Sequence, residues 1–267
     1  MNDLTELKTD VLAELERDQD DRTSRRHVVV KDTPPGSDWN IVEETILHRR
    51  SIRKFKGRQV PAHLIRRVLE IGRFAPSQGN CQPWAFVVVR DRKMIAQMEQ
   101  YCAAVCKAMS ANLDYTHYPK GSWKRLLTEF KTRFANRSRP NALHPVPMTA
   151  MKSIGAGRFA VFHRAPTVIL ILMDKRGVGS PEVDIGVVGT NIVLAAQSHG
   201  LGTCWVGFSK ILNSNKALCE TLGIAPPYEI SEAICVGYPI GDPTQNHVAR
   251  QTHEITWWEN GKKEIVY

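Results

Sequence analysis

The sequence lacks any apolar run close to the roughly 18 residues that a membrane-spanning helix requires. Residues 1–21 are acidic and amphipathic and contain no apolar core of the kind found in secretory signal peptides. The six cysteines are widely spaced and stand mostly within apolar runs, whereas a disulfide-stabilised scaffold carries its cysteines densely. We therefore expect a cytoplasmic protein with reduced thiols and no association with membranes.

Common nucleotide- and metal-binding motifs are also absent. No Gly-x-Gly-x-x-Gly follows a predicted strand and no Gly-x-x-x-x-Gly-Lys-Ser/Thr occurs, which argues against a Rossmann dinucleotide site and a P-loop. Cys102 and Cys106 stand four residues apart on a predicted helix, but a zinc site needs two further ligands, so buried structural thiols are the stronger interpretation. We predict no metal site.

Acidic residues are in the minority, 27 against 36 lysines and arginines, and the net charge is +9. A basic chain attracts anionic partners, which include phosphate cofactors, acidic substrates and nucleic acids. Because no recognition helix, zinc-finger spacing or aromatic–basic sheet pattern accompanies the charge, we expect no nucleic acid partner.

The chain contains enough apolar material for a core, with 42% hydrophobic and 24% charged residues. Its 267 residues suit one large α/β domain with an extension. Residues 3–15 carry one apolar helical face, a charged stretch follows, and Pro34-Pro35-Gly36-Ser37 is typical of a linker. We predict an arm over residues 1–37, packed on a partner subunit because a lone short helix is marginal in water, and a main domain over residues 38–267.

Hydrophobic patterning predicts the elements of the main domain. Apolar residues at helical spacing indicate helices at residues 38–48, 61–71, 91–109, 182–199 and 213–222. Continuous apolar runs indicate buried strands at residues 85–89, 166–173, 203–206 and 229–238. Asn213 is the expected cap of the last helix, and Gly200 and Gly223 are expected to end two helices. Helices around a mainly buried sheet indicate an α/β or α+β sandwich.

An arginine segment, Arg49-Arg50-Ser51-Ile52-Arg53-Lys54, follows the first of these helices. Four cations this close repel one another unless an anion lies among them. Arginine presents a planar fork of donors that matches phosphate oxygens, and Ser51 adds a hydroxyl. A phosphate site and a solvated charged patch both fit this pattern, and charge alone favours the patch.

Five motifs, in order, resemble the nitroreductase family of flavoproteins. They occupy residues 49–55, residues 75–84, Asp184-Ile185-Gly186 with residues 191–196, residues 200–203 and residues 236–239. The agreement covers about residues 40–110 and 164–255. The resemblance implies an α+β fold with a central, mainly antiparallel sheet flanked by helices, and a homodimer that holds FMN at the subunit interface.

The resemblance also assigns FMN contacts by position. The phosphate, ribityl chain and pyrimidine edge of FMN are expected to contact Arg49, Arg50, Ser51 and Arg53. Arg250 is expected to close on the phosphate. Pro76 and Ser77 are expected to face the flavin ring across the subunit boundary. Asn80 is expected to contact the polar edge of the ring. The segment Trp205, Val206 and Gly207 is expected to run beside the redox-active nitrogen of the ring. Gly207 suits this place because, without a Cβ, its backbone can approach a flat ligand closely.

The function implied by this resemblance is reduction of small aromatic acceptors, nitroaromatics or quinones, at the expense of NADH or NADPH by a ping-pong mechanism. The flavin carries the chemistry, so we nominate no catalytic residue. A reductive dehalogenase or an oxygen-using flavin enzyme of the same fold is the alternative, and a non-catalytic flavin-binding protein is a further one.

Residues 110–163 form a distinct basic region, which we call the lid segment because the resemblance places a variable lid there. Residues 117–164 hold ten lysines and arginines against one acid, Glu129. We expect the substrate to meet Tyr115, Trp123, Arg133 and Arg137, with further aromatic surface from Tyr118, Phe130 and Phe134. This hypothesis favours an anionic aromatic substrate or the phosphates of the nicotinamide donor. The equal alternative is a solvated helix whose aromatic residues pack against the core.

Overall fold

The computed structural model describes residues 29–30, 39–113, 118–138, 145–242, 250–251 and 253–265. The chain divides into two compact units, residues 40–244 and residues 1–39 with 245–267. The predicted helix at residues 3–15 and the linker at residues 34–37 lie outside the described residues. The predicted domain boundary after residue 37 stays a prediction.

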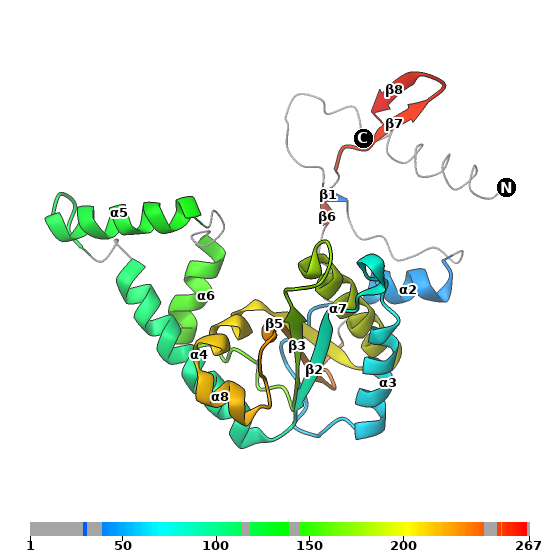
Figure 1. The fold of residues 1–267 in the computed structure, drawn as a ribbon, viewed down its shortest axis with the longest axis horizontal. Coiled ribbons are helices and arrows are strands. Elements are labelled where there is room, and N and C mark those ends of the chain that lie inside the picture. Colours follow the sequence, from blue (N-terminus) through cyan, green and yellow to red (C-terminus); the bar gives the residue numbers. More distant parts are fainter. Residues whose placement is uncertain are drawn as a thin grey trace. The chain divides into compact units, whose positions relative to one another are not determined.

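A four-stranded sheet lies at the centre of the larger unit, in the order β2-β3-β5-β4 (Figure 1). Its strands are β2 (Trp84–Val89), β3 (Thr167–Asp174), β5 (Tyr228–Gly237) and β4 (Gly202–Val206). All three pairings are antiparallel, and Ile169 of β3 stands opposite Val88 and Ile234. Seven of the eight residues of β3 are buried because both faces of this strand are covered, which explains its continuous apolar run.

Helices cover both faces of the sheet (Figure 1). On one face, α4 (Arg92–Leu113) and α6 (Pro145–Gly155) form a core with Met98, Cys102, Ile154, Phe162 and Leu170. On the other, α3 (Ala62–Arg73) and α7 (Pro181–Ser198) form a core with Val68, Ile171, Ile185, Val188 and Ile192. The prediction of an α+β sandwich with an antiparallel sheet is confirmed.

Local sequence rules place most element ends correctly. Asn40 caps α2 (Ile41–His48) in a capping box with Glu43, and Gly200 follows the end of α7 with φ +68°. The prediction of one helix at residues 213–222 capped by Asn213 is wrong. Residues Gly207–Ser214 form a 3₁₀-helix, and Asn215 caps α8 (Lys216–Thr221) by accepting from the Leu218 N–H.

A long-range contact explains this error. The side chain of Asn213 exchanges hydrogen bonds of 2.8 and 2.9 Å with the backbone of Ile230 on β5. Asn213 is therefore unavailable as a cap, and the next asparagine takes that role.

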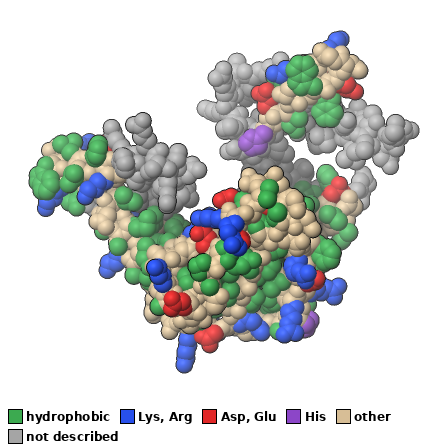
Figure 2. Space-filling model, viewed as in Figure 1, with side chains coloured by type: hydrophobic (Ala, Val, Ile, Leu, Met, Phe, Trp, Pro, Cys, Tyr) green, Lys and Arg blue, Asp and Glu red, His purple; other side chains and the backbone are tan. Residues whose placement is uncertain are grey.

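The lid segment is largely helical in its described parts. It contains the end of α4, then α5 (Trp123–Ser138) and α6. The Thr132 hydroxyl ties α5 to the end of α4 by donating to the Leu113 carbonyl at 2.9 Å. The side chains of Trp123 and Phe130 are 68% and 69% exposed, and Figure 2 shows hydrophobic side chains on this helix among lysines and arginines. Within one chain, these two aromatic side chains do not pack against the core.

The smaller unit joins the two ends of the sequence. Strand β1 (Val29–Val30) pairs with β6 (Arg250–Gln251), and β7 (Thr256–Glu259) forms a hairpin with β8 (Lys262–Ile265). Asn260 and Gly261 both have positive φ, as a two-residue type I′ hairpin turn requires. This hairpin was not among the predicted elements, although its Asn-Gly dipeptide is the signal that predicts one. In the described parts of the chain, no helix is long and apolar enough to cross a membrane.

Candidate functional site

The arginine segment runs from the end of α2 along the edge of the sheet. The Ile52 N–H donates to the Thr203 carbonyl at 2.8 Å, and the Lys56 N–H donates to the Tyr238 carbonyl at 2.8 Å. Ile52 and Phe55 are buried, whereas Ser51 and Arg53 are exposed. The buried pair anchors the segment on β4 and on the end of β5, and its polar side chains are left to face outward.

Gly202 of β4 makes this approach possible. A Cβ at this position would lie 2.8–2.9 Å from three side-chain atoms of Ile52, closer than real Cβ contacts. The Gly-Leu-Gly-Thr motif therefore serves two purposes, because Gly200 ends α7 and Gly202 admits Ile52.

We expect Gly202→Ala to lower the free energy of unfolding by about 1–3 kcal/mol, the usual cost of overpacking. Urea denaturation followed by circular dichroism measures this change. Gly186→Ala on α7 is the matched control, because a Cβ there meets no atom within 4 Å and alanine favours a helix. Equal stability of the two variants would contradict the assignment of Gly202.

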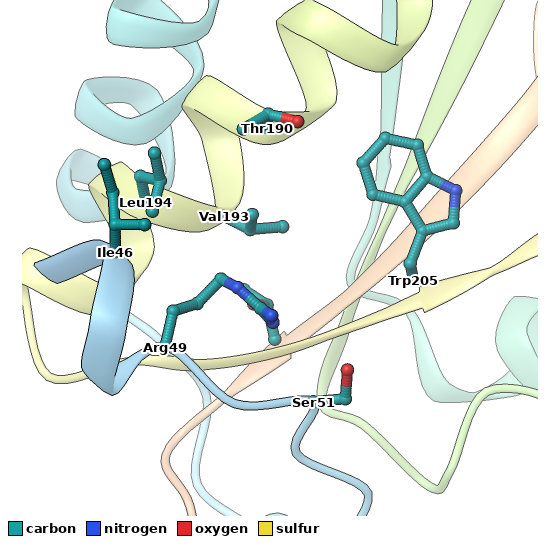
Figure 3. Close-up of a pocket in the computed structure, with 8 residues that line it drawn as sticks. Ile46, Arg49, Ser51, Thr190, Val193, Leu194 and Trp205 are labelled. Carbon is teal, nitrogen blue, oxygen red and sulfur yellow. The ribbon is translucent and has the colours of Figure 1, made fainter. Parts of the chain in front are cut away.

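A cavity of about 460 Å³ opens beside the arginine segment, within the range of about 300–1,000 Å³ common for small-molecule sites. Its lining residues come from α2, the arginine segment, α7 and β4: Ile46, Arg49, Ser51, Thr190, Val193, Leu194, Thr203 and Trp205. Figure 3 shows Arg49 reaching below α7 on the side of Ser51, with Trp205 across the space. None of the described residues that line the cavity is acidic, so it combines apolar walls with a cation and three hydroxyls.

Trp205 forms its far wall and is held in place by neighbours. Its indole N–H donates to Glu232 Oε2 at 2.8 Å. Its ring lies over Gly189 of α7, where a Cβ would stand 2.1 Å from the nearest ring carbon. Val206 is buried, and Gly207 begins the 3₁₀-helix that follows β4.

The other cations of the arginine segment lie in different surroundings. Arg50 is buried and donates to the carbonyls of Leu47 and Arg49, where it complements the negative end of α2. Burial raises the pKa of the Cys204 thiol, and Arg53 and Arg49 oppose this rise, so both guanidinium groups lie near β4. The guanidinium groups of Arg49 and Arg53 thus lie beside β4, while Arg50 supports α2.

Residues 46–238 match the family model described as the nitroreductase family. The chain belongs to the nitroreductase family. This match covers more than half of the chain and confirms the resemblance carried by the five motifs.

Individual proteins similar to this nitroreductase-family chain share its fold and much of its length. A 4-nitrobenzoate reductase from Nocardioides sp. is 28% identical over 227 residues, which cover 79% of this chain and 88% of that protein. A crystal structure of a nitroreductase with bound FMN from Desulfitobacterium hafniense aligns with a TM-score of 0.57 at 20% identity, over 83% of this chain and all of that one. The FMN- and NADPH-dependent nitroreductase NfnB from sphigopyxis sp. strain HMH aligns with a TM-score of 0.54 at 23% identity, over 79% and 95%.

Several residues assigned by the family resemblance lie apart from the cavity in a single chain. Pro76, Ser77 and Asn80 precede β2, at the opposite edge of the sheet from β4, and none of them lines the cavity. Ser77 Oγ accepts from the Gln82 N–H at 2.9 Å, and the Gln78 N–H points to the Asp184 carboxylate of α7 at 3.4 Å. These contacts fix the loop on its own edge of the sheet.

Other assigned residues fall wholly or partly outside the described residues. Tyr115 is one of them, and only the backbone is described for Arg133, Arg137, Phe134 and Arg250. Arg250 belongs to the smaller unit. Tyr118 is half-buried, and its carbonyl accepts from Arg125 at 3.2 Å. Within the described parts of the chain, no group of three or more His, Cys, Asp or Glu side chains is placed to hold a metal ion.

Two further residues interact with Trp205 and Arg53 in this nitroreductase-family chain and were not predicted from the sequence patterns. Glu232 stands in the middle of β5 directly before an apolar run, and a carboxylate there was an available signal. His163 lies in the turn before β3 with φ +52°, and its ring meets Phe159 edge-to-face at 5.0 Å. Burial, with Arg53 nearby, lowers the pKa of His163 to about 4. The sequence gives no local signal for the depressed pKa of His163, because Arg53, which contributes to it, lies far along the chain.

The depressed pKa of His163 predicts a loss of stability in mild acid. Unfolded histidine has a pKa near 6.5, so the unfolded chain binds this proton first as the pH falls toward 4. The contribution is present above pH 6.5 and decreases by about 2 kcal/mol between pH 7 and pH 5. We expect His163→Gln to remove that part of the pH dependence in urea denaturation, whereas His63→Gln on exposed α3 keeps it; identical profiles for the two variants would contradict this.

Proposed function

We propose that this chain is an FMN-dependent oxidoreductase that uses NADH or NADPH to reduce small aromatic acceptors, nitroaromatics or quinones. The observation that carries the proposal is the cavity, where Arg49 and Ser51 share one space with Val193, Leu194 and Trp205. A dianionic phosphate needs cations and donors, and a flat aromatic ring needs apolar walls. One cavity offers both, and its lining among the described residues includes no acid that would repel an anion.

The residues present fit FMN. Arg49 and Ser51 supply a guanidinium and a hydroxyl for the phosphate end, with Arg53 near by, and the Val206–Gly207 backbone follows the Trp205 wall. Bound FMN would accept a hydride from the nicotinamide and return electrons to the acceptor. Because the donor and the acceptor would meet the bound flavin in turn at one site, we expect ping-pong kinetics.

A homodimer belongs to the same proposal. Pro76, Ser77 and Asn80 lie across the sheet from the cavity in their own chain, which supports their contribution to the site of a second copy. Exposed apolar side chains on α2, which lines the cavity, and after α3 also support an interface between two copies. They include Ile41 and Val42 on α2, 75% and 62% exposed, and Phe74 after α3, 77% exposed. Isolated exposed apolar residues are ordinary, but two of these are consecutive residues of α2.

The similar proteins support the individual parts of this proposal. The reductase from Nocardioides acts on 4-nitrobenzoate, an anionic nitroaromatic compound, and the Desulfitobacterium protein holds FMN. A zwitterionic amino acid, the kind of substrate that an iodotyrosine dehalogenase takes, calls for acidic lid residues to meet its ammonium group. Residues 117–164 contain only Glu129, so nitroaromatics and quinones remain the preferred acceptors.

The decisive experiment is the visible spectrum of the purified protein, followed by addition of NADH or NADPH without oxygen. We expect about one FMN per subunit, bleached by one of the two donors and reoxidised by nitroaromatics or quinones. A colourless protein that gains no flavin from added FMN would defeat the proposal. A yellow protein that neither donor bleaches would retain the cofactor and remove the proposed reaction.

The lid hypothesis has its own test. We expect charge reversal of Arg133 and Arg137 on α5 to raise the Michaelis constant several-fold for acidic acceptors such as 4-nitrobenzoate but not for nitrobenzene, since charge attraction concentrates anions near the site. Lys93→Glu, at an exposed position of α4, is the control for net charge. Equal changes for the acidic and the neutral acceptor would exclude a role for α5 in recognising anions.

A further inference from the structure

Strand β5 carries two acidic residues, Glu229 near its start and Glu232 in its middle. Glu232 stands where the pairing with β3 is irregular. The β3–β5 register shifts between Ile171, opposite Glu232, and Leu172, opposite Ile230. Such irregularities redirect side chains near functional sites. The side chain of Glu232 is 17% exposed and points to β4, where its Oε2 accepts the Trp205 indole N–H at 2.8 Å.

Lys210 completes this arrangement. Its ammonium group lies 2.8 Å from Glu232 Oε1, so the two carboxylate oxygens are divided between a lysine and an indole. The ammonium group of Lys210 thus offsets the negative charge of Glu232 beside a cavity whose lining suits anions. A hydrogen bond to a charged acceptor is stronger than one between neutral groups, and it fixes the ring that donates it.

The backbone of α7 also restricts the position of the Trp205 ring. Gly189 lets the ring lie against the α7 backbone, since a Cβ there would stand 2.1–3.2 Å from three ring carbons. The position of the ring is therefore fixed by the α7 backbone on one side and by the hydrogen bond to Glu232 at the indole nitrogen. Its remaining surface forms the cavity wall opposite Arg49 (Figure 3).

We propose that Glu232 is a positioning residue: it fixes the Trp205 ring as a cavity wall and so determines how broad an aromatic acceptor the site admits. The choice of aromatic acceptors rests on the proposed function. Without the Glu232 carboxylate, the indole loses its acceptor and the ring is free to leave the wall, so broader acceptors gain access.

The ring itself is observed by fluorine NMR of protein labelled with 5-fluorotryptophan. The chain has six tryptophans, and the Trp205 resonance is identified by its loss in Trp205→Phe. We expect this resonance to shift or broaden in Glu232→Ala and in Gly189→Ala, and to return toward its wild-type position in Glu232→Gln, whose amide oxygen still accepts from the indole. The control is Glu229→Ala, which breaks the exposed ion pair of 2.6 Å with Lys175 on the same strand.

Selectivity is measured on the FMN-loaded enzyme as the ratio of kcat/KM for 1-nitronaphthalene to that for nitrobenzene. We expect Glu232→Ala to raise this ratio about tenfold, the effect of one charge-assisted hydrogen bond, and Glu232→Gln and Glu229→Ala to leave it near the wild-type value. In a Trp205→Phe background, which has no indole N–H, Glu232→Ala should change the ratio less than about twofold.

Two results would overturn the inference. One is an unchanged Trp205 resonance in Glu232→Ala, and the other is a selectivity change that persists in the Trp205→Phe background, since Glu232 would then act by charge alone. A wild-type protein that takes up no FMN would defeat the proposed function instead. The fluorine resonance of that FMN-free protein would still decide whether Glu232 holds the ring.

Discussion

Replacing Arg49 with glutamate is expected to weaken FMN binding at least about 100-fold. Arg49 lines the cavity together with Ser51. A charge-assisted hydrogen bond contributes about 1.5–3 kcal/mol, and a carboxylate in its place adds repulsion against a phosphate of about −1.5 to −2 charge. Each 1.4 kcal/mol is a factor of about ten in affinity. Titration of FMN fluorescence with apoprotein measures the dissociation constant.

The matched control for this variant is Arg67→Glu, the same charge change at an exposed position on α3. It should alter FMN affinity less than about threefold, because exposed charges beyond a Debye length of about 8–10 Å are largely screened. Arg49→Lys should give an intermediate loss, since an ammonium group retains charge but not the planar fork of donors. Equal losses in Arg49→Glu and Arg67→Glu would show that net charge, and not this cavity, attracts FMN.

Replacing Phe162 with alanine is expected to lower the free energy of unfolding by about 3–5 kcal/mol, the usual cost of emptying a buried phenylalanine site. Phe162 is fully buried in the core between the sheet, α4 and α6. Its backbone N–H donates to Glu99 at 3.0 Å, and its carbonyl accepts from the Cys235 thiol at 3.2 Å. Alanine keeps both backbone groups, so the loss reports the side chain.

Phe159→Ala is the matched control, because Phe159 belongs to the same turn and is 40% exposed. We expect this variant to cost about 1 kcal/mol or less. Urea denaturation at pH 7, followed in parallel by circular dichroism and tryptophan fluorescence, gives both values. Equal destabilisation would mean that the turn before β3, and not the core beneath it, limits stability.

The sequence by itself determined the elements whose causes are local. The apolar run of β3, the glycine after α7 and the capping box of α2 each depend on residues within a few positions of one another. The arginine segment and the four other motifs likewise predicted the family before any fold was known. These features follow from hydrophobic burial, backbone conformation and capping, which short stretches of chain express directly.

Only the tertiary structure decided which residues meet. Asn213 fits a local capping rule, yet it bonds to Ile230 on β5, and the cap passes to Asn215. Arg50, one of four neighbouring cations, turns back to α2, while Arg49 lines the cavity. Glu232 reaches Trp205 across 27 positions. Such contacts depend on strand order and register, which are selected by the packing of the whole chain, so no short stretch of sequence contains them.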